Sequence, residues 1–125
     1  MEINNPQALA EVTASFERYQ DAVIANDVAV LDELFWESAL TLRYGIAENL
    51  YGYGEIAAYR SGRSPAGLAR EVTKSVVTCF GRDFATTNIE FTRAGRHGRQ
   101  SQAWARMPEG WRIVAAHVSY MEGGK

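Results

Sequence analysis

The spacing of apolar residues changes once along this chain, and the change divides it into a helical part and a β part. Over residues 6–26 apolar side chains recur at three- and four-residue steps, the stripe of an amphipathic helix; they are Leu9, Val12, Phe16, Tyr19, Val23 and Ile24. Residues 71–120 instead hold β-branched runs separated by short turns. A chain patterned in this way is expected to fold with helices on one face of an antiparallel sheet.

Capping and turn residues set the expected limits of each element. Asn5 and Pro6 suit the N-cap and the first position of a helix, and Asp27 can cap a second one. The expected helices cover residues 6–26, 27–35 and 54–63; the expected strands cover residues 39–44, 49–51, 71–80, 84–92, 99–107 and 111–120; the expected turns include residues 64–67 and 94–98. This order predicts an α+β fold in which three helices from the N-terminal half pack on a curved antiparallel sheet.

Length and composition limit what such a chain can be. At 125 residues it suits one domain, residues 1–125, whose core needs no disulfide. The single cysteine, Cys79, excludes an intrachain disulfide and fits a reducing cytoplasm. Two histidines and one cysteine cannot build an ordinary zinc site, and no apolar stretch is long enough to span a bilayer. We therefore expect a cytoplasmic domain with no membrane insertion, no metal and no other cofactor.

Charge is distributed unevenly along the chain. Residues 1–62 carry ten acidic and three basic side chains, whereas residues 63–125 carry five acidic and ten basic ones, nearly all arginine. Arginine pairs with carboxylates and phosphates through two parallel hydrogen bonds, so the excess fits an anionic ligand or complementary surfaces within the domain. The arginines of residues 93–99 lack interleaved aromatic residues and the net charge is −2, which favours a solvated hairpin over a nucleic-acid site.

The last expected strand carries a pattern that is shared with a large superfamily. Residues 110–119 (GWRIVAAHVS) resemble the closing strand of nuclear-transport-factor-2-like (NTF2-like) proteins, which include ketosteroid-isomerase and SnoaL-like domains. The resemblance implies a conical half-barrel, or cystatin-like cone, with a pocket between sheet and helices. Because the pattern recurs in many members, it indicates the fold and not an activity.

Four further segments resemble a narrower family, and the resemblance covers nearly the whole chain. They are residues 26–36 (NDVAVLDELFW), 48–52 (ENLYG), 90–95 (EFTRAG) and 98–100 (GRQ), which are similar to the AtzH-like, or oxalurate-catabolism (HpxZ-like), family. The resemblance implies a small bacterial homodimer, encoded beside an amidase-signature hydrolase and acting on ureido carboxylates in nitrogen-compound catabolism. In the cyanuric-acid pathway the family member is assigned the conversion of 1,3-dicarboxyurea to allophanate.

The same resemblance implies two catalytic residues, a tyrosine on the first helix and an arginine on the first strand, which are Tyr19 and Arg43 here. From the residues alone, Tyr19 fits either a core tyrosine bonded to a backbone carbonyl or a hydroxyl that projects into a pocket as a donor. Arg43 alternates with Leu40 and Leu42, which by itself indicates a solvent-facing or ion-paired side chain. Given the resemblance, we prefer a buried Arg43 that binds a ligand carboxylate.

Weaker candidates for substrate binding are His117, Glu48, Asn49 and Trp104. His117 alternates with Ile113 and Ala115, so we expect it on their side of the sheet, as a pocket wall or a core histidine. The two hairpin residues lie where polar side chains are common. Trp104 shares a strand face with Gln100 and Gln102, a row that would line either a pocket or a water-facing edge strand.

Three hypotheses of function remain open. The first is a cofactor-independent hydrolase or decarboxylase in which Arg43 anchors a small anionic ureido substrate and Tyr19 donates a proton. The second is a non-catalytic protein that binds such an acid or supports the neighbouring amidase. The third is an isomerase-like enzyme with Glu48 as the base. We also expect a two-fold dimer through an apolar sheet face that includes Trp104, Val114 and Val118.

Overall fold

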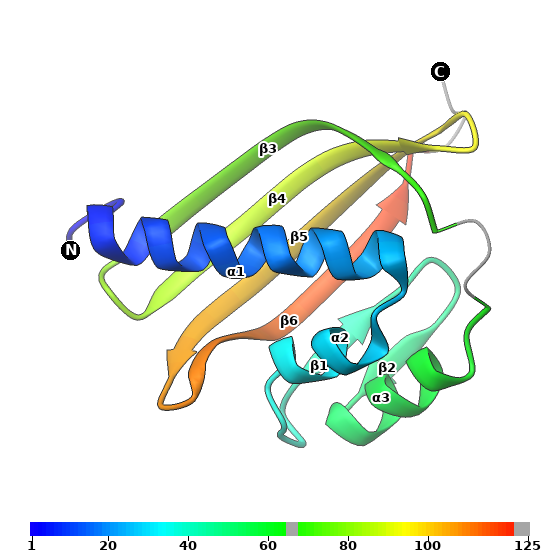
Figure 1. Cartoon of the computed structure of the whole chain (residues 1–125), viewed down its shortest axis with the longest axis horizontal. Coiled ribbons are helices and arrows are strands. Elements are labelled where there is room, and N and C mark those ends of the chain that lie inside the picture. Colours follow the sequence, from blue (N-terminus) through cyan, green and yellow to red (C-terminus); the bar gives the residue numbers. More distant parts are fainter. Residues whose placement is uncertain (65–67, 122–125) are drawn as a thin grey trace.

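Three helices and six strands form within residues 1–64 and 68–121, the part of the chain that the computed structural model describes. The helices are α1 (Pro6–Ala25), α2 (Val28–Leu34) and α3 (Tyr53–Ser61). The strands are β1 (Leu42–Tyr44), β2 (Asn49–Tyr51), β3 (Glu71–Phe80), β4 (Phe84–Arg93), β5 (Arg96–Met107) and β6 (Gly110–Tyr120). The turn expected at residues 64–67 lies largely outside the described residues. Figure 1 shows α1 crossing one face of the sheet.

The predicted capping residues begin the first two helices. The Asn5 side chain accepts a hydrogen bond from the Ala8 N–H at 3.1 Å, with Pro6 at the first helical position. The Asp27 carboxylate accepts one from the Val30 N–H at 3.2 Å. Between them Asn26 adopts a left-handed conformation (φ 51°) that ends α1 and lets the chain turn into α2. These local signals fix where α2 lies relative to α1.

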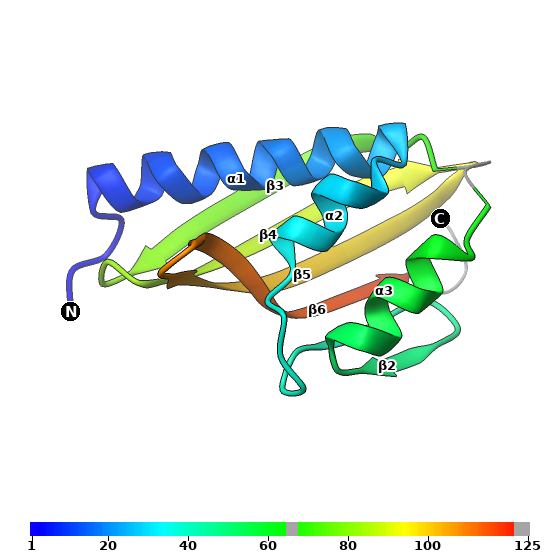
Figure 2. The same ribbon diagram turned by 60° about the horizontal axis from the view of Figure 1, so that its bottom comes forward.

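The sheet has the order β2-β1-β6-β5-β4-β3. Strands β3 to β6 form an antiparallel meander, as expected, and β1 pairs with β2 in a short hairpin. The pairing of β1 with β6 is parallel, with Arg43 opposite Ala116. Figure 2 shows the two layers, with the helices on one side of the sheet. The expected α+β fold with three helices on a curved sheet is confirmed. No helix among the described residues is long and apolar enough to cross a membrane.

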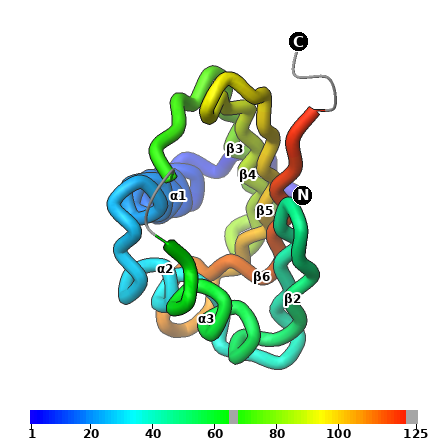
Figure 3. Tube along the Cα trace, turned by 90° about the vertical axis from the view of Figure 1, so that its right-hand side faces the viewer, coloured from blue at the N-terminus to red at the C-terminus, as the bar shows by residue number. Residues whose placement is uncertain are grey.

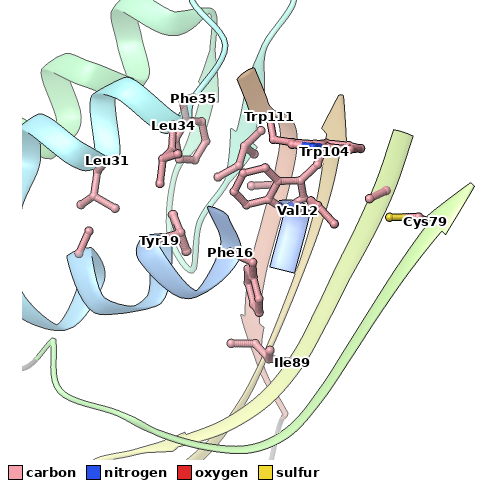
Figure 4. Packing of buried hydrophobic residues seen from close by; sticks show 14 of the residues in the cluster. Val12, Phe16, Tyr19, Leu31, Leu34, Phe35, Cys79, Ile89, Trp104 and Trp111 are labelled. Atoms are coloured by element: carbon pink, nitrogen blue, oxygen red, sulfur yellow. The ribbon is translucent and has the colours of Figure 1, made fainter. Parts of the chain in front are cut away.

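The core lies between α1, α2 and the inner face of the sheet (Figure 4). The Phe16 and Trp104 rings meet edge to face with centroids 6.5 Å apart, and Trp104 is fully buried. Its indole N–H donates to Thr87 Oγ1 at 3.0 Å, and that hydroxyl donates to Gln102 Oε1 at 3.1 Å. Because β5 lies between β4 and β6, the water-facing alternative for this polar-aromatic row is wrong.

The first strand is shorter than predicted, because residues 38–41 form a turn. Ser38 Oγ accepts a hydrogen bond from the Leu40 N–H at 3.0 Å, and Thr41 Oγ1 donates to the Trp36 carbonyl at 2.7 Å. Leu40 is therefore 77% exposed. The alternation in the sequence predicts that Leu40 and Leu42 share one face of a strand, and this prediction is wrong. Hydrogen bonds from these polar side chains to the nearby backbone replace the strand-to-strand hydrogen bonds that a longer β1 would form.

An irregularity in β6 reverses the expected position of His117. Trp104 is opposite Ile113, but its neighbour Ala103 is opposite Ala115, so β6 holds one extra residue between these two pairs. Ile113 is fully buried on the inner face, whereas Ala115 and His117 lie on the outer face. The prediction that these three residues share one face is wrong, because a β-bulge interrupts the two-residue alternation.

Candidate functional site

A cavity of about 360 Å³ lies between the helices and the inner face of the sheet. All three helices contribute to its wall, as do β1, β4, β5, β6 and the segments that follow β1 and α3. Figure 3 looks along the sheet from the end of the molecule where α3 lies, with helices and strands on opposite sides. The cavity is large enough for a small organic ligand.

The described lining of this cavity is strongly cationic. Six arginines contribute to it, Arg43, Arg60, Arg63, Arg70, Arg93 and Arg96, against a single carboxylate, that of Glu48. A low-dielectric wall with this charge raises the local concentration of anions. Four of the eight arginines after residue 62 therefore meet at one cavity, which supports an anionic ligand over complementary surfaces alone.

Arg43 and Glu48 form an ion pair at the β1–β2 turn. Arg43 Nη1 donates to Glu48 Oε2 at 2.9 Å, and the guanidinium lies 5.8 Å from the centre of the Tyr59 ring. Glu48 Oε1 accepts the Ala47 N–H at 3.3 Å. The carboxylate approaches Gly45 so closely that a Cβ there would lie 1.6 Å from Oε2, so a side chain at this position would displace the Glu48 carboxylate from Arg43. Both Glu48 oxygens have partners within the protein, which disfavours the isomerase-like hypothesis with Glu48 as the base.

Arg60 is compensated by charge. Its Nη1 donates to Asp32 Oδ1 at 2.5 Å, and its guanidinium lies 4.8 Å from the centre of the Phe35 ring. Arg60 is 5% exposed, so this is a buried ion pair that joins α3 to α2. The charge of this arginine is already balanced without a ligand.

Arg63 and Arg70 have only neutral partners among the described residues. Arg70 donates to Gln20 Oε1 at 2.5 Å and to Gln100 Oε1 at 3.3 Å, and Arg63 donates to Asn26 Oδ1 at 3.4 Å. The Nε of each is buried without a hydrogen-bond partner. No described carboxylate lies within 4.0 Å of either one. Within the described part of the chain, these two cations of the cavity wall have no compensating charge.

Electrostatics tie Tyr19 to these two arginines. Burial, and after it the neighbouring guanidinium groups, hold the pKa of Arg63 below its ordinary value. Burial also lowers the pKa of Arg70, and the Tyr19 phenol opposes the shift at both arginines. The Tyr19 hydroxyl therefore lies within electrostatic reach of both guanidinium groups.

Tyr19 lines the cavity and is 6% exposed. Its ring stacks on Phe16 with centroids 6.5 Å apart and meets Phe35 at 6.3 Å, which fixes its orientation from α1 (Figure 4). Within residues 1–64 and 68–121 the hydroxyl forms no hydrogen bond, so the backbone carbonyl that a core tyrosine would use is absent there. The side chain is held rigidly while its donor remains available to a ligand.

The cavity brings together three of the six predicted site residues: Tyr19, Arg43 and Glu48. Asn49 is exposed in the hairpin and Trp104 is in the core; neither is among the residues that line the cavity. His117 is exposed on the outer face, where its ring meets Tyr44 at 5.6 Å. The other five cavity arginines were missed, although the arginine excess after residue 62 was a signal for most of them. No described cluster of histidine, cysteine, aspartate or glutamate suits a metal.

Known proteins resemble the chain over nearly its whole length. The AtzH-like family model matches residues 1–124. A protein of unknown function from Pectobacterium atrosepticum, of the DUF3225 family, is 56% identical, with a TM-score of 0.94 over 96% of this chain and 95% of that one. A cystatin-like fold protein from Burkholderia xenovorans is 46% identical, with a TM-score of 0.92 over 97% of each chain.

A more distant neighbour supports the fold alone. An NTF2-like protein with a cystatin-like fold from Novosphingobium aromaticivorans is 22% identical, with a TM-score of 0.74 over 94% of this chain and 84% of that one. The comparison with proteins of curated function gives no match. The matches confirm the resemblance that the sequence carries and the NTF2-like architecture.

Proposed function

Because this chain belongs to the AtzH-like family, we propose that its cavity binds a small ureido carboxylate and removes a carboxyl group from it without a cofactor. Conversion of 1,3-dicarboxyurea to allophanate is the reaction of this kind that the family resemblance implies. The observation that carries the proposal is the pairing of an available Tyr19 hydroxyl with a cavity wall of six arginines and one carboxylate.

Arg43 is the proposed anchor for one substrate carboxylate. A guanidinium has five N–H donors, and only Nη1 of Arg43 is engaged by Glu48. The remaining donors can hold a ligand carboxylate, while Glu48 and the Tyr59 ring keep the guanidinium in place. Positioning of this kind supplies much of the catalysis when the bond to be broken is already labile.

Tyr19 is the proposed proton donor. When the bond between a urea nitrogen and its carboxyl carbon breaks, CO₂ leaves and the electron pair remains on the nitrogen. The Tyr19 hydroxyl donates its proton to that nitrogen, which gives allophanate, and the phenolate then takes a proton from water. The cations near the hydroxyl stabilise the negative charge that develops on its oxygen.

Turnover of 1,3-dicarboxyurea by the wild type, two site variants and one control variant tests this proposal. We expect Tyr19→Phe to lower kcat by about a hundredfold or more, since a positioned proton donor contributes at least that much. Arg43→Ala should chiefly raise KM. Tyr51→Phe is the matched control, because Tyr51 lies on β2 at 55% exposure, outside the lining of the cavity.

Equal rates for the wild type, both site variants and a buffer blank would contradict an enzymatic role. In that case the non-catalytic hypothesis is tested by calorimetry with the ureido acid and with the neighbouring amidase. A binding signal without any change in the ligand would support that second function.

A further inference from the structure

Arg70 is held in a built position inside the cavity. It follows α3 in sequence but bonds α1 through Gln20 and β5 through Gln100, and its guanidinium lies 4.9 Å from the centre of the Phe91 ring on β4. Three separate elements thus fix one planar cation. The conformational freedom that an arginine normally loses on binding a ligand is already lost here.

The partners of this cation among the described residues are all neutral. Gln20 and Gln100 present amide oxygens and Phe91 presents a ring face, none of which carries a charge. Arg63 repeats the arrangement with the amide oxygen of Asn26. Buried charges are normally paired, because removing an ion from water costs several kcal/mol. Each of these cations, with only dipolar partners among the described residues, therefore leaves a place for an anion.

Arg70 lies away from Arg43 across the sheet, whereas Arg63 lies within electrostatic reach of Arg43. Arg43 is on β1, whereas Arg70 is anchored on β5 and β4, with β6 between β1 and β5. Strands two positions apart are separated by about 10 Å at the backbone. The cavity therefore has two cationic regions rather than one, and the Tyr19 hydroxyl lies within electrostatic reach of the second.

We propose that Arg70 provides a second anion-binding point, assisted by Arg63 in the same cavity wall, so that the cavity selects ligands with two acidic groups over ligands with one. The inference rests on the proposed function for the identity of the substrate, but its charge argument stands on these contacts. It also explains release of the product: loss of a carboxyl group converts a dianion into a monoanion, which can no longer occupy both points. The site thus binds what enters the reaction more tightly than what leaves it.

A pair of stable ligands that differ by one charge provides the test. Glutarate and 1,3-dicarboxyurea both have a chain of five atoms when the two carboxyl carbons are counted. Glutaramate has a neutral amide of the same shape in place of one carboxylate of glutarate. Calorimetric Kd values for both ligands are measured on the full chain in the wild type and in Arg70→Gln, Arg63→Gln and the double variant. The matched control is Arg99→Gln, which removes the same charge from an exposed outer residue.

The readout is the ratio of the two Kd values, which does not depend on the fraction of folded protein. We expect the Kd of the wild type to be about tenfold to a hundredfold lower for glutarate than for glutaramate, because hydrogen bonds to a charged group contribute a free energy of this size. In Arg63→Gln/Arg70→Gln the ratio should fall toward two, the statistical advantage of a ligand with two equal ends. Arg70→Lys should restore part of the preference, and Arg99→Gln should leave it unchanged.

An unchanged ratio in the double variant, or no preference in the wild type, would overturn the second binding point. The outcome is separable from that of the proposed function. If the wild type turns over 1,3-dicarboxyurea but the Kd ratio is unchanged in the double variant, the second binding point is refuted and the proposed enzymatic function stands. If the wild type shows no turnover but the Kd ratios are as expected, the second binding point stands and the proposed enzymatic function is refuted.

Discussion

Identical side chains in one cavity wall can affect stability in opposite directions. Arg60 meets the Asp32 carboxylate, whereas Arg70 meets two amide oxygens. Both are removed from water, and only the first recovers the lost hydration through an opposite charge. The difference has a measurable consequence in the ligand-free protein.

Replacing each of these arginines by methionine should change the free energy of unfolding with opposite signs. Arg60→Met leaves Asp32 without its cation and should lower stability by about 2–3 kcal/mol. Arg70→Met removes an uncompensated charge while keeping most of the packing volume, and should raise stability by about 1 kcal/mol. Urea denaturation without ligand measures both values. Destabilisation of similar size in both variants would show that Arg70 acts as a structural residue.

The residue scale also shows how far sequence alone could go. The apolar stripe places Tyr19 toward the core, and the resemblance selects it together with Arg43 from the other polar residues. The partner of Arg43 is Glu48, five residues away, and a short hairpin makes that pairing foreseeable. Arg70 contacts residues 50 and 30 positions away, which no local pattern encodes. Contacts between residues so far apart in sequence can be assigned only once the fold is known.

At the scale of elements, the sequence predicts order and type well and register less well. Caps at Asn5 and Asp27 begin their helices as expected, because each signal acts within three residues. The extra residue in β6 was not foreseeable, because Ile113, Ala115 and His117 alternate without a break in sequence. A bulge is decided by the partner strand, here by how Trp104 and Ala103 are placed on β5.

Gly98 explains a second boundary that the sequence missed. The expected turn covered residues 94–98, but β5 resumes at Arg96 because the Phe91 ring of β4 covers the missing side chain of Gly98. A Cβ there would lie 2.3 Å from the nearest Phe91 ring carbon. Glycine here provides space for an aromatic ring rather than a turn.

Gly98→Ala should therefore destabilise the protein by about 1–3 kcal/mol, because the Phe91 ring has to move out of a packed core. Gly54→Ala is the control: a Cβ at that position in α3 would meet nothing within 4 Å, and alanine favours the helix. Thermal unfolding measures both variants. A neutral Gly98→Ala would mean that the ring is loosely packed, and the ring's contact with Arg70 would then be loose as well.

At the scale of the whole molecule, the outer face of the sheet has no helix over it (Figure 2). A shallow depression there is lined mainly by small or apolar side chains, among them Leu42, Tyr44, Ala103 and Ala115. The residues named for this face from the sequence were partly wrong. Val118 lines the cavity, because the faces of β6 were assigned without the bulge, and Trp104 is in the core on the same face of β5 as Gln100 and Gln102.

We predict a two-fold dimer through this outer face, since a solvated depression lined mainly by small or apolar side chains is unfavourable. Ala103→Glu should convert the dimer to a monomer, because it buries a charge at the centre of the contact. Light scattering should give twice 13.9 kDa for the wild type and 13.9 kDa for the variant. Ala10→Glu, on the exposed side of α1, should remain dimeric. A wild-type particle of 13.9 kDa at micromolar concentration would refute the prediction.

The surplus of cations inside the chamber also affects how the purified protein has to be handled. Citrate, phosphate and sulfate are small multivalent anions, and they will compete with the natural ligand for the guanidinium groups of the cavity wall. A preparation in such a buffer will look more heat-resistant and less active than one dialysed into a zwitterionic buffer of low ionic strength. Assays and crystallisation trials should therefore treat the counter-ion as a reagent.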